Sequence, residues 1–247
     1  MNLLKTMTMG SGLACALLAV STYASVTIGG TRVVYPLGQR EVTVKLDNDS
    51  RNPSLVQVWM DDGDPDARPD EIKVPFVITP PIFRMDPQKA QTLRVMYSGG
   101  PLPQDRESVY WLNVLDIPPK ASNAPGTNSL QLAYRTRIKV FVRPAKLAGS
   151  PEEAPAQLRW KIAASPDGKG QALSVTNPTP YYVSFSEIDV ESGGRTFRNE
   201  QGGMVAPHAS VILPVAKLNA VAEGAQVHYI AISDYGGALG GDAALGQ

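Results

Sequence analysis

Cysteine is nearly absent from this chain of 247 residues, which contains only Cys15. Cys15 lies in an N-terminal segment with the layout of a secretory signal peptide. In that segment Lys5 supplies positive charge, a short apolar run follows, and small residues precede a cleavage point between Ala24 and Ser25. The apolar run is too short to span a bilayer. We therefore predict a signal peptide over residues 1–24, which is removed on export.

The predicted mature chain has no cysteine, so it carries no disulfide although it is exported to an oxidising compartment. Its stability must then come from burial of apolar surface. A lipid anchor on Cys15 is the alternative. Cys15 lies inside the apolar run and not after it, however, and this position disfavours lipidation.

An excess of charge of one sign and further long apolar runs are also missing. Without residues 1–24 the chain has 22 basic and 23 acidic residues, and this balance argues against a phosphate-binding surface for nucleic acid. No later apolar stretch approaches membrane-spanning length, so we expect no direct insertion into a membrane.

Side chains that could carry chemistry are few. The two histidines, His208 and His228, have neither a serine elbow nor a thiol as a partner, so we predict that the protein is not an enzyme. The glycine pairs match neither a phosphate-binding loop nor a dinucleotide fingerprint, and we therefore predict no cofactor.

An acidic loop that begins at Asp62 suggests a metal at first sight. Asp62, Asp64 and Asp66 occupy positions one, three and five of a calcium loop. Ala67 stands where that loop needs glycine, and Lys73 stands where it needs a glutamate. We therefore predict a solvated loop and no metal site.

Strand signals, by contrast, run through the whole mature chain. Short segments rich in β-branched and aromatic residues alternate with turn residues, and no window shows a capped helical period. About seven such segments lie between Ser25 and Val142, the number typical of an immunoglobulin-like sandwich. The clearest are 42–46, 55–59, 92–97 and 109–115.

A polar stretch with several prolines, from Arg143 to Pro155, interrupts this pattern, and fewer and shorter strand signals follow it. We predict an all-β protein of two immunoglobulin-like β-sandwich domains, over residues 25–146 and 147–247, with the second one looser. Because the tail after Gly237 is rich in glycine and alanine, we expect the last strand to be missing or frayed.

Four stretches, in this order, carry a family resemblance: Leu102–Pro119, Arg137–Pro144, Asn177–Val183 and Ser233–Gly237. Together they resemble landmarks of the PapD-like periplasmic chaperones of the chaperone–usher pilus pathway. The resemblance implies two domains set at an angle with a cleft between them. It also implies a periplasmic location and the binding of pilus subunits that lack their last strand.

The resemblance assigns roles to individual residues. Arg32 and Lys139 match a cleft pair that binds the C-terminal carboxylate of a pilus subunit. A donor strand is implied over about residues 130–142, and the side chains that it inserts into the pilus subunit are Leu130, Leu132 and Tyr134. A charged trio that bridges the domains is formed by Glu107, Arg143 and Asp234.

Each role has a plainer alternative. Without the resemblance, the three donor side chains would be the core-facing half of an ordinary strand. The two cleft cations would be solvated charges, and Glu107 and Arg143 would be an incidental surface pair of little energetic value.

The function that follows is a periplasmic chaperone that stabilises and caps pilus subunits by donor-strand complementation and delivers them to the outer-membrane usher. The alternative is a secreted β-sandwich protein of the binding or adhesin type, without chaperone activity. An exposed donor strand also leaves open the self-association of the free protein.

Overall fold

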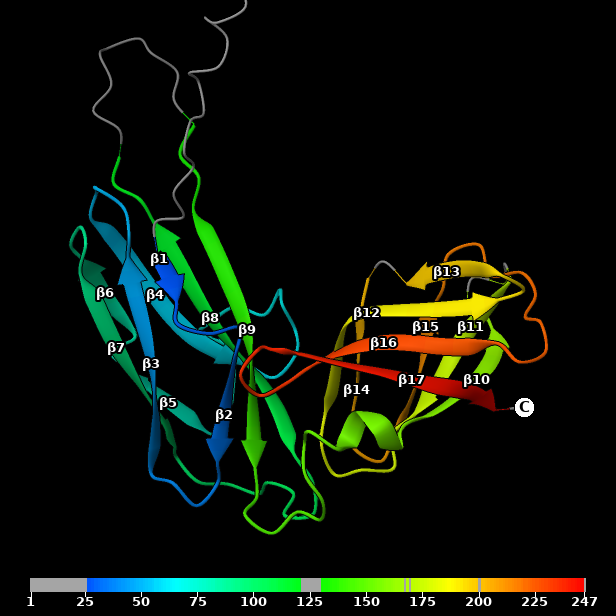
Figure 1. Ribbon diagram of the computed structural model, residues 1–247. Coiled ribbons are helices and arrows are strands. Elements are labelled where there is room, and N and C mark those ends of the chain that lie inside the picture. Colours follow the sequence, from blue (N-terminus) through cyan, green and yellow to red (C-terminus); the bar gives the residue numbers. More distant parts are fainter. Residues whose placement is uncertain (1–25, 121–129, 167, 169, 200, 247) are drawn as a thin grey trace, which may run out of the picture.

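The computed structural model describes residues 26–120, 130–166, 168, 170–199 and 201–246, which form two β domains (Figure 1). The predicted signal peptide with its cleavage point, Cys15 and the Ala121–Ser129 part of the loop before the donor strand lie outside the described residues. Within the described part, the only helix is the short 3₁₀-helix η1, and no helix there is long and apolar enough to cross a membrane. The predicted all-β fold class is confirmed.

The first domain is a sandwich of two sheets. One sheet has the strand order β1-β3-β7-β5, and the other has the order β2-β9-β8-β4-β6. Among the described strands of this domain, only β2 and β9 pair in parallel. The bounds are β1 Val26–Ile28, β2 Arg32–Pro36, β3 Glu41–Asn48, β4 Ser54–Asp61, β5 Phe76–Thr79, β6 Ile82–Met85, β7 Ala90–Tyr97, β8 Ser108–Ile117 and β9 Tyr134–Arg143.

Nine strands are described in this domain where the sequence predicts about seven. The excess arises where the chain changes sheet. Gly29 and Gly30 separate β1 from β2, Pro80 and Pro81 separate β5 from β6, and in both cases the two short strands belong to different sheets. Proline and glycine interrupt a strand, because the one lacks an N–H and the other has no side chain to pack.

Alternate residues of the two sheets build the core between them. Leu46 and Leu93 come from one sheet, Leu112 and Val140 come from the other, and all four are fully buried. In β9 the core-facing residues have even numbers from Ile138 onwards, so the odd-numbered ones lie on the outer face of the sheet.

The second domain is held by one sheet that bends around a core of its own. Its order is β13-β12-β16-β17-β10-β11-β15, with β14 also paired to β12. The bounds are η1 Ala154–Gln157, β10 Arg159–Ala164, β11 Gln171–Thr176, β12 Val183–Ser192, β13 Arg195–Asn199, β14 Gly203–Val205, β15 Ser210–Pro214, β16 Gln226–Ile232 and β17 Ala238–Gly246.

The expectation of a missing or frayed last strand is wrong. β17 pairs with β16 over seven residues and joins β10 in parallel near its end, so it links the two halves of the sheet. Glycine fits this position because Tyr229 packs close to the strand. A Cβ atom at Gly241 would lie 2.5 Å from Tyr229 Cζ. The second domain is therefore a complete sandwich.

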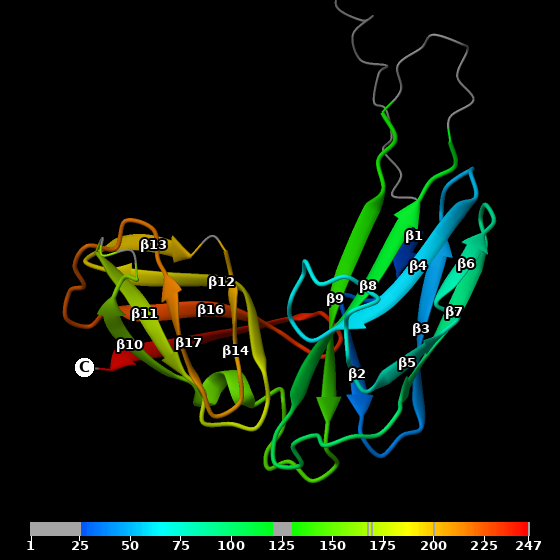
Figure 2. The same ribbon diagram turned by 180° about the vertical axis from the view of Figure 1, so that it is seen from behind.

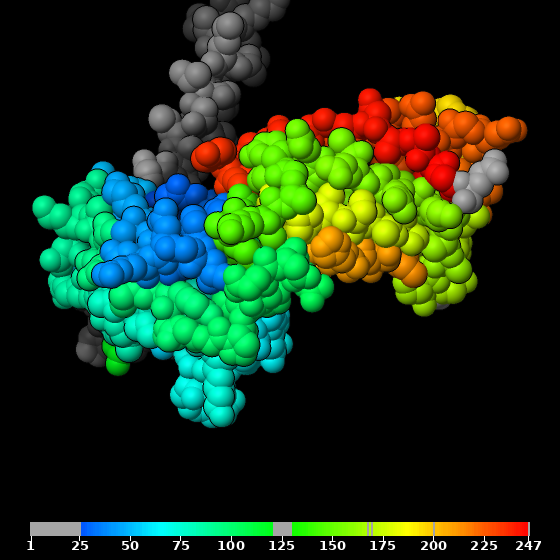
Figure 3. All heavy atoms as spheres, turned by 90° about the horizontal axis from the view of Figure 1, so that it is seen from below, coloured from blue at the N-terminus to red at the C-terminus, as the bar shows by residue number. Residues whose placement is uncertain are grey.

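The two domains meet at an angle, with β8 and β9 on the side of the first domain that faces the second (Figures 1 and 2). In space-filling view the domains form two lobes joined by the chain around residues 143–150 (Figure 3). Leu147 already packs against the second core.

Candidate functional site

Arg32 and Lys139 lie side by side on neighbouring strands. The parallel pairing of β2 with β9 puts their Cα atoms directly opposite one another. Both side chains line a pocket of about 410 Å³ between the domains. We call it the interdomain pocket, and it is lined by Thr31, Arg32, Trp111, Arg137, Ile138, Lys139, Ser186, Ile232, Gly236, Gly237 and Ala238.

Both cations reach across to the second domain. Arg32 Nη1 donates a 2.9 Å hydrogen bond to the carbonyl of Ile232, and Lys139 Nζ donates one of 3.1 Å to Ser184 Oγ. The two side chains are half-buried, whereas the plainer interpretation of the sequence made them solvated charges. Arg32 Nε is buried and has no hydrogen-bond partner among the described residues.

Burial and the closeness of the two cations make positive charge costly in the pocket. Burial lowers the pKa of Lys139 to about 8, and the neighbouring charge of Arg32 contributes to the shift. Burial also lowers the pKa of Arg32, against the opposing effect of Asp234, but an arginine remains charged. An anionic group between the two cations would relieve this repulsion and accept charge-assisted hydrogen bonds.

A third cation of the pocket, Arg137, is missing from the sequence prediction. It donates two hydrogen bonds to buried Asp61, of 2.9 Å from Nε and 2.5 Å from Nη2, and its guanidinium lies 4.6 Å from the ring centre of Trp111. Burial acts to raise the pKa of Asp61, but hydrogen bonds from Arg137, Asn113 and Gly63 outweigh it, so this pKa lies below its ordinary value. Arg137 and Lys139 are two residues apart in one strand, so the sequence could have indicated that both side chains lie on the same face of the sheet.

The predicted donor strand begins later than expected. Strand β9 starts at Tyr134, so residues 130–133 of the predicted range are not in a strand. β9 needs β8 as its partner, and β8 ends at Ile117. The last residues that pair at this end are therefore Asp116 of β8 and Tyr134 of β9. The side chains of Leu130, Leu132 and Tyr134 are 84%, 50% and 62% exposed. Core packing, the plainer alternative for these three residues, is therefore wrong.

The N-terminal half of β9 has an open edge. On one edge, β9 pairs with β8 along almost the whole length of β9. On the other edge, β9 pairs with β2 only from Lys139 to Arg143. No strand among the described residues pairs with that edge from Tyr134 to Ile138. Backbone groups there are available to a further strand, and the open edge ends at the interdomain pocket.

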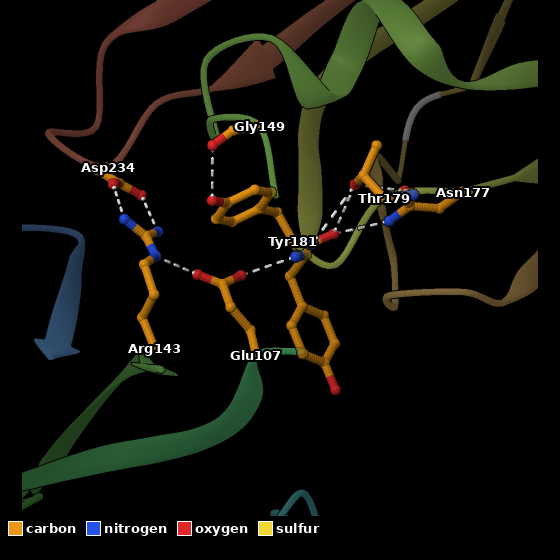
Figure 4. Close-up of polar contacts among 8 residues, drawn as sticks. Glu107, Arg143, Gly149, Asn177, Thr179, Tyr181 and Asp234 are labelled. Atoms are coloured by element: carbon orange, nitrogen blue, oxygen red, sulfur yellow. Dashed lines mark hydrogen bonds and ion pairs between the residues drawn. The ribbon is translucent and has the colours of Figure 1, made fainter. Parts of the chain in front are cut away.

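The charged trio joins the two domains (Figure 4). Arg143 donates through Nε to Glu107 at 2.6 Å, and through Nη1 and Nη2 to the two carboxylate oxygens of Asp234 at 2.6 and 2.9 Å. The second oxygen of Glu107 accepts the backbone N–H of Tyr182 at 2.8 Å. The three residues are thus one connected group, not an incidental surface cluster.

Burial dominates the electrostatics of this trio. Glu107 is only 3% exposed, and burial raises its pKa despite the charge of Arg143 and the N–H of Tyr182. For Arg143, burial opposes the charged form, but hydrogen bonds to Asp234 and the charge of Glu107 raise the pKa above its ordinary value. Arg143 therefore remains charged between two carboxylates.

The other candidate groups of the sequence have ordinary surroundings. In the acidic loop, Asp64 accepts the N–H of Asp66 at 2.9 Å, and the described residues contain no cluster of acidic, histidine or cysteine side chains suited to a metal. His228 lies between two carboxylates, with its Nδ1 2.5 Å from Asp242 Oδ1 and its Nε2 3.3 Å from Glu191.

Comparison with known proteins places this chain in a family. The model of the PapD N-terminal domain of pili and flagellar-assembly chaperones matches residues 25–148. The model of the C-terminal domain of the pili assembly chaperone PapD matches residues 153–243. Together they cover most of the chain.

Curated relatives align with nearly the whole length of this chain. The chain is 47% identical to the probable fimbrial chaperone YadV of Escherichia coli K12, over 94% of each chain. It is 45% identical to the chaperone protein FimB/FhaD of Bordetella pertussis, over 93% of this chain and 92% of the relative.

Solved structures are similar as well. The crystal structure of the YadV chaperone aligns with a TM-score of 0.77 at 45% identity, over 90% of this chain and 100% of the other. A structure of the Salmonella enterica SafA pilin in complex with the SafB chaperone aligns with a TM-score of 0.74 at 30% identity, over 90% and 97%. The chain therefore belongs to the PapD family of pilus-assembly chaperones.

Proposed function

We propose that the protein is a periplasmic chaperone that caps pilus subunits by lending them the N-terminal part of β9 and then delivers them to the outer-membrane usher. The observation that carries the proposal is the open edge of β9, which begins at exposed Tyr134, directly after exposed Leu130 and Leu132, and ends at the pocket that contains Arg32 and Lys139. The family relationship, and the pilin complex of a similar chaperone, support a pilus subunit as the partner.

In this proposal the pilus subunit supplies an incomplete sheet. Its unpaired backbone groups form hydrogen bonds with residues 130–138, while its apolar groove receives Leu130, Leu132 and Tyr134. Each such side chain contributes about 1.5–3 kcal/mol when it is fully buried. The same open edge could also pair with a second copy of the free chaperone.

The pocket would fix the register of this pairing. Backbone hydrogen bonds repeat along a strand, so strand pairing alone leaves the register weakly specified. The carboxylate at the C-terminus of the pilus subunit, held by Arg32 and Lys139, would anchor one end.

The parts of the chain have distinct tasks in this proposal. Residues 1–24 are removed after Ala24, residues 25–146 form the domain that binds the pilus subunit, and residues 147–247 form the second wall of the pocket. The trio of Glu107, Arg143 and Asp234 holds the two domains at their angle. The protein acts by binding alone, without catalysis or a cofactor.

The alternative, a secreted binding or adhesin-type protein, has less support. It offers no reason for an unpaired edge that leads into a cationic pocket, whereas the proposed strand donation uses both features.

The test is a pair of arginine substitutions on opposite faces of the donor segment. Leu132→Arg should leave the isolated protein folded, because Leu132 is exposed, but it should abolish protection of a pilus subunit from aggregation. Ala133→Arg, also at an exposed position but on the other face, should keep most of this protection. The probe is a pilus subunit identified by its co-purification with the tagged protein from periplasmic extract.

Two results would contradict the proposal. One is a Leu132→Arg protein that still keeps the pilus subunit soluble. The other is equal loss of protection in both variants, which would mean that the alternation of side chains does not matter.

A further inference from the structure

A side-chain hydrogen bond links the residues directly before β9 to the end of β8. The one strand ends and the other begins at the same end of the first domain (Figure 1). Their pairing stops at Asp116 and Tyr134, and no residue from 130 to 133 is buried. Gln131 nevertheless lies beside the end of β8, because its Nε2 donates a 2.7 Å hydrogen bond to the carbonyl of Pro118. Neither strand pairing nor burial therefore explains the place of this segment.

The residues after β8 explain why a side chain supplies the link. β8 ends at Ile117 and is followed by Pro118 and Pro119. A proline has no backbone N–H, so these two residues cannot donate to a neighbouring strand. Each keeps a carbonyl oxygen, and the amide group of Gln131 uses that of Pro118.

The bond also holds the segment near the place that a longer β9 would occupy. If the pairing register of β8 and β9 continued, Pro118 would lie opposite Leu132. In such an extended strand Leu130 and Leu132 share one face and Gln131 lies on the other. The bond therefore leaves both leucines accessible, and their side chains are 84% and 50% exposed.

We propose that Gln131 is a positioning residue, whose bond to Pro118 keeps residues 130–133 ready to extend β9 before a pilus subunit binds. This inference rests on the proposed function, which makes these residues part of the donor segment. A segment that is already held near its bound position loses less conformational entropy on binding. Gln131 would thus contribute to affinity without contact with the pilus subunit.

The kinetics of binding distinguish positioning from direct contact. Loss of the bond lowers the fraction of molecules whose segment is in place, so association becomes slower. Dissociation starts from the complex, in which the pilus subunit itself holds the segment, so its rate should change little. Loss of a direct contact would mainly make dissociation faster.

The test compares variants of residue 131 that remove or keep the hydrogen-bond donor. Gln131→Met keeps a side chain of similar length without an N–H, and Gln131→Lys keeps a donor. The probe is the pilus subunit that co-purifies with the tagged protein, at an ionic strength that screens the added lysine charge. By surface plasmon resonance, Gln131→Met should slow association about three- to tenfold without a change in dissociation. Gln131→Lys should associate like the wild type.

Gln104 provides a matched control. Its Nε2 also donates an exposed hydrogen bond to a backbone carbonyl, that of Leu102 at 3.0 Å, but it lies in the loop before β8. Gln104→Met should leave both rate constants unchanged. Because both bonds are exposed, the thermal midpoint should be nearly the same in all of these proteins.

A measurement on the free protein tests the positioning without a pilus subunit. In nuclear magnetic resonance relaxation, the backbone amides of Leu130 and Leu132 should be more mobile in Gln131→Met than in the wild type or in Gln131→Lys. Equal mobility in the three proteins would overturn the proposal.

Two kinetic results would also overturn it. One is an association rate of Gln131→Met equal to that of the wild type, and the other is faster dissociation as the main effect, which would mean direct contact. Neither result bears on the proposed function, which fails separately if Leu132→Arg still protects the pilus subunit. The two failures are therefore distinguishable.

Discussion

At the scale of single residues, the interdomain pocket is an arrangement of cations that favours an anion. Arg32 and Lys139 are brought together by strand pairing, and the buried position lowers the pKa of both. Arg137 is held by its bonds to Asp61, which neutralises its charge. The uncompensated positive charge therefore lies on Arg32 and Lys139.

The lowered pKa of Lys139 predicts that the proposed binding of a pilus subunit depends on pH. A carboxylate in the pocket favours the protonated lysine, so binding raises the pKa of Lys139 from about 8 and takes up a proton when the free lysine is neutral. The affinity should be constant below about pH 7 and should fall as pH rises through 8, by about tenfold at pH 9. Titration calorimetry with a purified pilus subunit measures this change.

Lys139→Arg is the matched control, because arginine keeps its charge throughout this range. Its affinity should be nearly independent of pH between about 7 and 9. A pilus subunit whose C-terminus is amidated should bind weakly at every pH. Parallel pH profiles for the lysine and arginine proteins would show that Lys139 does not contact the carboxylate.

The family resemblance locates the residues of the pocket and the trio, but it does not locate their supports. Arg137 and Asp61 acquire their surroundings from strands far apart in the sequence. Both look like ordinary charged strand residues until the pairing of the strands is known. Their burial is a tertiary property with no local signal.

At the scale of elements, the proposed donor segment, residues 130–138, is only partly preformed as a strand. The sequence predicts a strand from about residue 130, yet pairing stops at Tyr134 because β8 ends at Ile117. Alternation of apolar residues predicts which side chains share a face, but the length of a strand is fixed by its partner. In the proposed complex, the pilus subunit would extend β9 towards Leu130.

Strand β17 illustrates the opposite error. Glycine and alanine predict a weak strand, because glycine is flexible and packs poorly. In the structure, Tyr229 stacks with Trp160 at a ring distance of 5.7 Å and occupies the space where a side chain at Gly241 would lie. The glycine is part of the packing, and the sequence alone does not distinguish this case from disorder.

This packing predicts different effects for two adjacent glycines. Gly241→Ala should destabilise the second domain by about 1–3 kcal/mol, because its Cβ would overlap the Tyr229 ring. Gly240→Ala should leave stability unchanged or slightly raised, because no atom lies within 4 Å of the added Cβ. Urea unfolding measures both, and equal stabilities would mean that Tyr229 can move away at little cost.

At the scale of the whole molecule, polar contacts set how the two domains meet. Each domain has a separate apolar core, and the trio, the Glu107 N–H bond to the carbonyl of Pro180, and the Phe141–Tyr182 ring contact lie between them. The pocket is lined from both sides, by Lys139 of one domain and Ile232 of the other. The angle between the domains therefore determines the shape of the proposed binding site.

Arg143→Ala should disturb this arrangement strongly. The substitution leaves Glu107 buried without its cation, and removal of one partner from a buried pair costs about 3–5 kcal/mol. It also releases Asp234, which lies in the loop between β16 and β17 next to the pocket. We expect a lower thermal midpoint, a wider distribution of domain angles in small-angle scattering, and weaker binding of the pilus subunit.

The double variant Arg143→Ala with Glu107→Gln separates the two consequences of this loss. A glutamine at position 107 needs no counter-charge and can still accept the N–H of Tyr182, so much of the lost stability should return. The domain angle should remain loose, because the link from β9 to Asp234 is still absent. Affinity for the pilus subunit should therefore stay low while the thermal midpoint recovers. If affinity recovers together with stability, the trio acts only by stabilising the fold, and the angle between the domains is held by other contacts.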